Sequence, residues 1–224
     1  MSDRPLIDWT WIVEHLDDIG FRTVQHLWLA AIAVAVGFVI AFGLSLLVVR
    51  YRRLYGLVTG ISGVLYTIPS LAMFAILVPI TGLSVLTAEI PLILYTLLIF
   101  IRNIVAGFDA VSGDVLEAAD GMGFTRRRRL RTIELPLAVP LIITGIRLAS
   151  VSTIGLVMIV SLIGDNFGGL GLFIKEGIQT FFPTKVYVGA VLSLVLAFGA
   201  DAAFVLVERA LTPWARARST VVTT

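Results

Sequence analysis

LWLAAIAVAVGFVIAFGLSLLVV, residues 27–49, contains no ionisable side chain and is followed directly by the basic group Arg50-Tyr51-Arg52-Arg53. About 20 mostly apolar residues in a helix cross the roughly 30 Å hydrocarbon core of a bilayer. The stretch therefore predicts a membrane-spanning helix that ends at a charged boundary.

The composition of the whole chain agrees with a membrane protein. Of its 224 residues 58% are hydrophobic and 14% are charged, against about 45–50% and about 25% in ordinary soluble domains. A soluble monomer would lack the polar surface that it needs, so much of the apolar surface faces lipid. Cysteine is absent, which excludes disulfide frameworks, thiolate metal sites and cysteine nucleophiles. A net charge of +2 is too small for a nucleic-acid partner.

Four further apolar stretches resemble the first. They cover residues 57–80, 90–101, 146–163 and 186–207, and the short third stretch needs residues 82–88 to reach across the bilayer. We therefore expect an all-α polytopic bundle of about five transmembrane helices.

The basic residues predict the orientation, because Lys and Arg in short loops stay on the cytoplasmic side. With the N-terminus outside and the C-terminus inside, twelve arginines are cytoplasmic, four basic residues are outside, and Arg147 lies at a span edge. The cytoplasmic set is Arg50, Arg52, Arg53, Arg102, Arg126, Arg127, Arg128, Arg129, Arg131, Arg209, Arg216 and Arg218, and the outer set is Arg4, Arg22, Lys175 and Lys185.

The chain divides into three segments in this interpretation. Residues 1–26 place Trp9, Ile12 and Leu16 at helical spacing, which favours an extracytoplasmic interfacial helix; a frayed tail is the alternative. Residues 27–212 form the transmembrane domain, and residues 213–224 form a cytoplasmic tail.

Signs of catalysis are weak. Neither Lys175 nor Lys185 stands in a P-loop frame. His15 and His26 precede the first span, without acidic partners at metal-ligand spacing, and are expected to be interfacial. We expect no cofactor and no metal in this chain.

The cytoplasmic segment from Asp114 to Pro136 is too structured for a passive connector. Asp114 and Glu117 have the spacing of a capping box, and Gly121 and Gly123 can end the helix with a left-handed residue. Thr125 is a candidate cap for a second short helix, and Pro136 is expected to break the chain as it turns toward the membrane.

This loop resembles that of a known family. Glu117-Ala118-Ala119, Gly123 and Ile133-x-Leu135-Pro136 follow one another at the spacing found in ABC importer permeases. The resemblance implies a type I importer permease fold, similar to the methionine permease, and a coupling helix at about residues 112–124 that sits in a cleft of the ATPase. It also implies that Glu117, Ala118, Ala119 and Gly123 are the ATPase-coupling residues. A capped hairpin that stabilises only its own loop is the alternative, and the neighbouring arginines, residues 126–129, are expected to contact anionic lipid.

Other motifs are similar to the osmoprotectant branch of the family. They are Tyr66-Thr67-Ile68-Pro69-Ser70-Leu71-Ala72, Leu94-Tyr95, Arg102-Asn103 with Gly107, Glu134-Leu135-Pro136-Leu137-Ala138 with Pro140, and Gly145-Ile146-Arg147. This likeness implies import of glycine betaine, choline or carnitine. Phe100 and Asp165-Asn166-Phe167 depart from the usual pattern, and the second departure touches the outer loop.

Polar and small residues inside the spans carry further expectations. Pro69 is expected to kink the second span or merely to bend it. The small residues Gly145, Ala149 and Thr153 suit close helix contact, within one subunit or across a dimer. Arg147 and Asp201 are candidates for an ion pair within the membrane, because isolated charges there are costly. The glycine-rich segment with Gly168, Gly169 and Gly171 is a candidate outer gate loop.

The resemblance implies several partners in a bacterial or archaeal inner membrane: an ABC ATPase dimer that binds ATP and Mg²⁺, a second permease copy or a paralogue, and an extracytoplasmic substrate-binding protein. Recognition of a quaternary ammonium by an aromatic cage would fall mainly to the binding protein. The alternatives are a permease for methionine or sulfonates, and a scaffold or channel that needs no ATPase.

Overall fold

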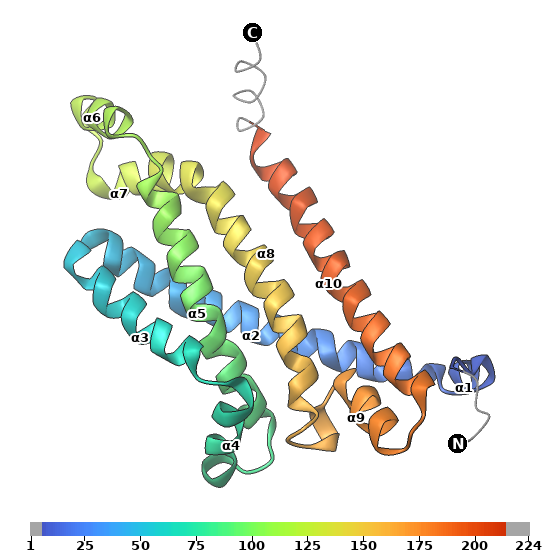
Figure 1. Ribbon diagram of the computed structural model, residues 1–224. Coiled ribbons are helices and arrows are strands. Elements are labelled where there is room, and N and C mark those ends of the chain that lie inside the picture. Colours follow the sequence, from blue (N-terminus) through green and yellow to red (C-terminus); the bar gives the residue numbers. More distant parts are fainter. Residues whose placement is uncertain (1–5, 214–224) are drawn as a thin grey trace.

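A computed structural model describes residues 6–213, and this part of the chain is helical throughout, without strands (Figure 1). The predicted tail at residues 213–224 lies almost entirely outside the described residues. The helices are α1 Trp9–Glu14, α2 Leu16–Arg50, α3 Tyr55–Thr67, α4 Ser70–Thr81, α5 Val85–Asp109, α6 Gly113–Gly121, α7 Arg126–Arg129, α8 Leu135–Val160, α9 Gly171–Gln179 and α10 Pro183–Leu211, with short turns η1 Arg52–Leu54, η2 Leu130–Glu134 and η3 Asp165–Phe167.

Within residues 6–213, four continuous helical stretches are long and apolar enough to span a membrane: α2, α5, residues 126–160 and α10. A bent pair of helices, residues 52–67 and α4, passes the same test together and makes a fifth span if the two pieces cross as one; they meet at 90°. The expected number of about five spans is therefore confirmed, but the second span is broken at Pro69 and not gently curved.

Helix boundaries differ from the sequence prediction at three places. The first membrane helix starts at Leu16, since a short α1 ends at Glu14. The third is a full 25-residue helix that begins at Val85. Pro136 does not break the chain, because residues 126–160 continue as one helical stretch and Pro136 follows directly after the π-helical turn η2.

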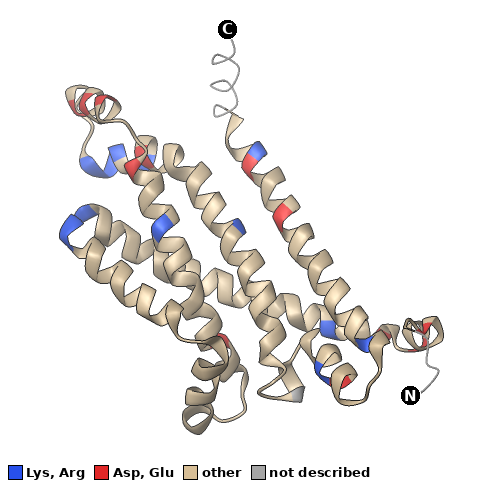
Figure 2. Ribbon diagram, in the orientation of Figure 1, with Lys and Arg blue, Asp and Glu red and all other residues tan. Residues whose placement is uncertain are grey.

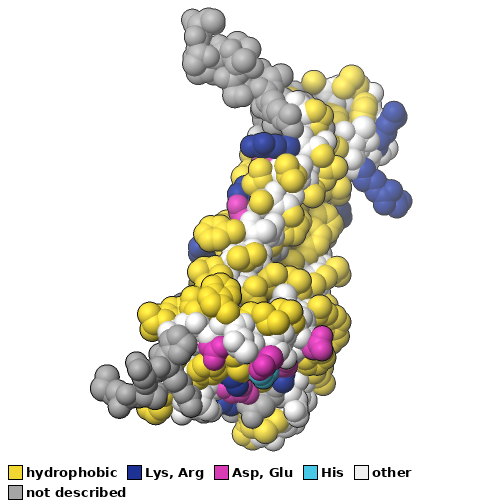
Figure 3. All heavy atoms as spheres, turned by 90° about the vertical axis from the view of Figure 1, so that its right-hand side faces the viewer, with side chains coloured by type: hydrophobic (Ala, Val, Ile, Leu, Met, Phe, Trp, Pro, Cys, Tyr) yellow, Lys and Arg dark blue, Asp and Glu magenta, His cyan; other side chains and the backbone are white. Residues whose placement is uncertain are grey.

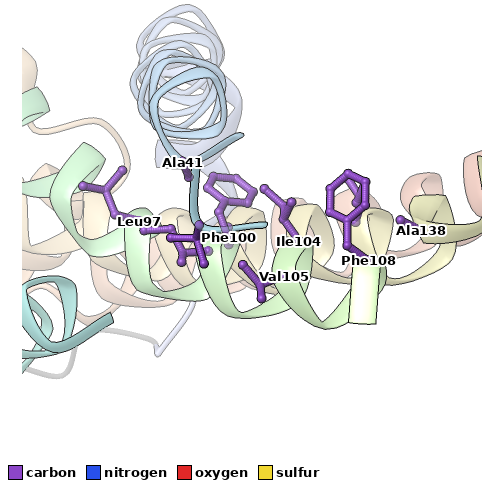
Figure 4. Packing of buried hydrophobic residues seen from close by; sticks show 11 residues of the cluster. Ala41, Leu97, Phe100, Ile104, Val105, Phe108 and Ala138 are labelled. Atoms are coloured by element: carbon purple, nitrogen blue, oxygen red, sulfur yellow. The ribbon is translucent and has the colours of Figure 1, made fainter. Parts of the chain in front are cut away.

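α5 is the centre of the bundle and packs between α2 and α8 (Figure 1). Figure 4 shows Phe100, Ile104 and Phe108 of α5 close to Ala41 of α2 and Ala138 of α8. Close approach depends on small residues, since a Cβ on Gly37 would overlap the Thr96 hydroxyl.

The small residues of α8 also serve this packing. A Cβ on Gly145 would lie 2.8 Å from Cβ of Asn103 in α5, and Ala149 is fully buried in the same core cluster. Contact within the subunit, the first of the two alternatives, therefore accounts for Gly145 and Ala149.

The two ends of the molecule differ in their charged residues and in the short helices that lie there. α6, α7 and the end of α10 lie at one end, while α1 and α9 lie at the other (Figure 1). Figure 2 shows charged residues mainly at these two ends. In Figure 3 hydrophobic side chains cover most of the middle of one face, as expected for contact with lipid. The arginine-rich end is the predicted cytoplasmic end, and the positions of the helix ends agree with an odd number of crossings.

Candidate functional site

α6 projects from the cytoplasmic end on the connection between α5 and α8 (Figure 1). Ser112 caps it by accepting a hydrogen bond from the Val115 N–H at 3.4 Å. The cap was expected at Asp114, which instead lies in the first turn, where a negative charge suits the helix dipole. The predicted capping box is therefore wrong, although the helix is present.

Gly123 ends this helical segment with φ +76°, a left-handed conformation that costs glycine little. The following N–H of Phe124 donates to the Ala119 carbonyl at 3.1 Å, and the Gly123 N–H donates to the Asp120 carbonyl at 3.0 Å. These bonds satisfy carbonyls that a helix end otherwise leaves open. The chain can thus reverse toward the membrane directly after α6.

The four predicted coupling residues do not all face outward. Glu117, Ala118 and Gly123 are exposed, whereas Ala119 is fully buried. Ala119 therefore packs α6 onto its own loop and is not available to a partner. Met122, which is 67% exposed, adds an apolar side chain to the exposed surface at the end of α6. The sequence analysis missed it as a candidate contact residue, although it stands directly before Gly123.

Arg129 fixes α6 to the bundle. Its Nη1 lies 2.5 Å from Oδ2 of Asp120, and its Nε lies 2.9 Å from Oε1 of Glu134. Thr125 caps α7, as expected, by accepting from the Arg128 N–H. Since residues 126–160 form one continuous helical stretch, the two ion pairs connect the end of α6 directly to α8.

A basic pocket of about 510 Å³ lies beneath this loop. Arg126 and Arg127 contribute to it together with Arg50 and Arg52 of the α2–α3 connection. Arg52 is paired with Asp109 at 2.5 Å. A hydrogen bond from Arg50 lowers the pKa of the Tyr51 phenol. Of the arginines at residues 126–129, Arg126, Arg127 and Arg129 line the pocket, whereas Arg128 lies over the Phe124 ring.

Arg147 of α8 and Asp201 of α10 are brought together by the fold. Nε of Arg147 lies 3.0 Å from Oδ1 of Asp201, and Nη2 lies 3.1 Å from Oδ2. Glu208, two turns further along α10, approaches Nη1 of Arg147 at 3.5 Å. Glu208 is seven residues after Asp201, a spacing that puts both acids on the same face of a helix, and the sequence analysis missed it as a second partner of Arg147.

The glycines of the predicted outer gate loop are buried and closely packed. A Cβ on Gly171 would overlap the Met158 carbonyl, and one on Gly168 would lie 2.8 Å from Ser161. Gly169 has φ +53° and faces His26. These glycines hold the loop against α2 and α8, so they do not form an open docking surface.

His26 anchors the same loop, which corrects the expectation that it is interfacial. The side chain is fully buried, with Nε2 2.9 Å from the Ile154 carbonyl and Nδ1 3.3 Å from the Leu170 N–H. Nδ1 therefore accepts and Nε2 carries the proton. One imidazole connects α2, α8 and the segment before α9.

Glu89 stands directly before the predicted apolar stretch at residues 90–101, and the sequence analysis gave it no role. It lies within α5, is 5% exposed, and neither carboxylate oxygen has a hydrogen-bond partner among the described residues. α5 thus carries a buried acidic side chain within a membrane-spanning helix.

A cavity of about 430 Å³ opens at the break between α3 and α4. Tyr66 and Tyr95 line it, with ring centroids 5.7 Å apart and planes at 71°. The Tyr95 hydroxyl donates a hydrogen bond to the carbonyl of Ile68, the extended residue that follows α3 at the break. The other walls come from α5 and α8.

Comparisons with known proteins cover nearly the whole chain. The sequence pattern of the family described as "Binding-protein-dependent transport system inner membrane component" matches residues 33–213. The glycine betaine/carnitine/choline permease OpuCB of Bacillus subtilis is 34% identical, over 88% of this chain and 89% of the relative. The choline permease OpuBB of B. subtilis is 35% identical over 90% and 94%, and the osmoprotectant permease OsmW of Salmonella typhimurium is 37% identical over 88% and 95%.

Solved structures share the fold. A chain of the MetNI methionine ABC transporter, in inward facing conformations, superimposes with a TM-score of 0.76 at 21% identity, over 95% of this chain and all of that one. A chain of an amino acid ABC transporter with histidines gives 0.71 at 20% identity, over 93% and 99%. The type I importer permease fold expected from the sequence is thereby confirmed.

Proposed function

The chain belongs to the family of binding-protein-dependent transport system inner membrane components, and from this premise we propose that it imports osmoprotectants such as glycine betaine, choline or carnitine. Family membership makes it a multi-pass permease of the inner membrane, in a system whose ATP hydrolysis belongs to a separate subunit. The curated relatives, at 34–37% identity over most of the chain, support the substrate class.

One observation supports the coupling role most directly. α6 presents Glu117 and Ala118 outward at the cytoplasmic end, while Arg129 pairs both with Asp120 in the last turn of α6 and with Glu134 before α8. A partner that pushes on α6 therefore pushes on α8 as well, since the connection is ionic and short. A loop that stabilised only itself would not need an exposed face on a firmly held helix.

The proposed assembly has two permeases, identical or paralogous, and two ATPase subunits that bind ATP and Mg²⁺ and grip the two α6 helices. α10 supports this arrangement, because Leu194, Val195 and Phe198 are exposed along it, which suits a surface that faces lipid or a second permease. The substrate-binding protein would dock at the opposite end, where α1 and α9 lie.

Transport follows from two states of this assembly. Closure of the ATPase pair moves the α6 helices toward each other and tips the bundle between inward-open and outward-open forms. ATP can drive this change because the partner binds the two forms with different affinities. The Arg147 and Asp201 pair would keep α8 and α10 together while the bundle tips.

Uptake by the reconstituted system tests the proposal. The permease, its ATPase and its binding protein are placed in liposomes with ATP, and uptake of labelled glycine betaine, choline, methionine and taurine is compared. Accumulation of the first two above the outside concentration supports the proposal. Accumulation of methionine or taurine alone would assign the chain to one of the rival substrate classes.

The permease without its ATPase is the control in this assay. It should concentrate nothing, since the chain lacks a nucleotide-binding motif of the P-loop type. Solute flux without the ATPase would instead support the channel alternative.

A further inference from the structure

The cavity at the α3–α4 break lies inside the membrane-spanning part and has no charged side chain in its lining. Its walls are aromatic, aliphatic and hydroxyl-bearing side chains from four helices. A volume of about 430 Å³ is within the usual range of small-molecule sites, about 300–1,000 Å³. A ligand here would have to be recognised by dipoles and rings.

The break places two opposite helix ends at this cavity. Ile68 and Pro69 are extended, with ψ 127° and 131°, so that α3 ends and α4 begins within three residues. The last carbonyls of α3 lack helical donors, and Pro69 has no N–H to offer to Leu65. α4 begins without a side-chain cap, which leaves its first N–H groups open. The C-terminal end of α3 therefore favours a positive charge, and the N-terminal end of α4 favours a negative charge.

The aromatic pair lies on the side of the α3 end. Tyr95 is nearly buried and is held by its hydrogen bond to Ile68, while Tyr66 is 43% exposed. The ring of Tyr66 meets that of Tyr95 edge to face, so both are kept in place. An electron-rich ring attracts a ligand cation, including quaternary ammonium groups.

A buried threonine of α8 also lines the cavity. Thr153 of α8 is 1% exposed and lies in the cavity wall. Thr96, which is buried to the same extent, donates to the Ile93 carbonyl at 2.7 Å. Because a threonine hydroxyl can donate and accept a hydrogen bond, Thr153 offers a polar contact to a ligand in the cavity.

We propose that this cavity is a transmembrane binding subsite for a compact zwitterion that carries a quaternary ammonium and a carboxylate. The ammonium lies against Tyr66 and the carbonyl end of α3, and the carboxylate lies at the N-terminus of α4 within reach of Thr153. This inference rests on the proposed function and deepens it, because it assigns substrate recognition to the permease as well as to the binding protein. A purely anionic ligand would be repelled by the α3 carbonyls.

Uptake by the reconstituted transporter with saturating binding protein tests both halves of the subsite. Tyr66→Leu should lower uptake of glycine betaine and of choline about five- to tenfold, because the ring is lost, whereas Tyr66→Phe should keep it within about twofold. Tyr187→Leu is the matched control on α10, where Tyr187 is similarly exposed, and should have no effect.

The carboxylate half is tested by Thr153→Val, a nearly isosteric change that tests the subsite even if Tyr66→Leu fails to assemble. It should lower uptake of glycine betaine about three- to tenfold and leave choline, which has no carboxylate, unchanged. Equal effects on the two substrates, or none, would overturn the subsite.

The two proposals fail in different ways. If the wild-type system imports neither substrate, the proposed function is wrong, and the subsite proposal is withdrawn with it. If the wild type imports both, and the Leu and Phe variants of Tyr66 behave alike, the subsite alone is wrong.

Discussion

Arg147 and Asp201 meet through two nearly parallel contacts, Nε to Oδ1 at 3.0 Å and Nη2 to Oδ2 at 3.1 Å. This geometry matches the planar guanidinium to the carboxylate and gives directional as well as ionic attraction. It joins α8 to α10 across 54 residues of sequence. Because both side chains are partly exposed in the isolated subunit, water or lipid headgroups weaken the pair to some extent.

Loss of one partner should therefore cost more than loss of both. Asp201→Asn leaves Arg147 with Glu208 at 3.5 Å and should lower stability by about 1–3 kcal/mol. The double variant Arg147→Met with Asp201→Leu should lose less than Asp201→Asn does. Thermal unfolding in nanodiscs measures both, and Glu208→Gln is the control with the smaller expected effect. A double variant less stable than Asp201→Asn would contradict this account.

Charge reversal on α6 should uncouple the permease from its ATPase. Glu117 is exposed on a helix that Arg129 holds, so Glu117→Lys should remove binding energy without unfolding the bundle. We expect at least about tenfold less ATPase in pull-down experiments, as for loss of a buried interfacial charge contact. Glu14→Lys makes the same charge change on the exposed surface of α1 and should not alter the yield. Unchanged co-purification of the Glu117 variant would argue against the coupling role.

A single methyl group distinguishes two glycines that look alike in the sequence. Gly171→Ala should destabilise the protein by about 2 kcal/mol or more, because the new Cβ overlaps the Met158 carbonyl and neither backbone can move freely. Gly155→Ala meets no atom within 4 Å and should leave the melting temperature unchanged or slightly raised. Thermal unfolding of the two variants in the same detergent is the measurement, and equal melting temperatures would refute the close contact.

Anionic phospholipid should bind at the basic pocket. Arg126 and Arg127 line it next to apolar Leu116 and Leu130, a combination suited to a phosphate headgroup and the start of its acyl chains. Arg126→Gln with Arg127→Gln should lower retention of phosphatidylglycerol in native mass spectrometry by about fivefold. Arg53→Gln, outside the lining residues, is the matched control. Displacement by inorganic phosphate alone would indicate a simple anion site.

Much of the fold could be predicted from local patterns. The run at residues 27–49 and the arginines after it identify a membrane helix and its cytoplasmic end, because hydrophobic length and charge are properties of consecutive residues. The loop around Glu117 could be found in the same way, since caps and glycine turns are local. Its capping residue could not be placed reliably, because Ser112 and Asp114 are both good caps and the surrounding packing selects between them.

Burial inside the bundle could not be read from those patterns. His26 and Glu89 stand near the ends of apolar runs, where an interfacial position is the simpler expectation. The tertiary structure buries both side chains. His26 of α2 is buried against α8, and Glu89 is buried within α5. Ala119 belongs to a recognisable motif, yet only the return of the chain after Gly123 decides that it faces inward.

The amino-acid sequence alone indicated that this chain is a helical membrane permease, which side of it faces the cytoplasm, and where its proposed coupling loop lies. Hydrophobic length, arginine placement and motif spacing are one-dimensional, and a helix expresses them with little help from its neighbours. Only the tertiary structure decided that Pro69 separates two helices at 90° around a cavity, and that Thr153 from a distant helix lines it. Such sites depend on directions and distances between elements, which arise when helices pack and are not stored in any one segment.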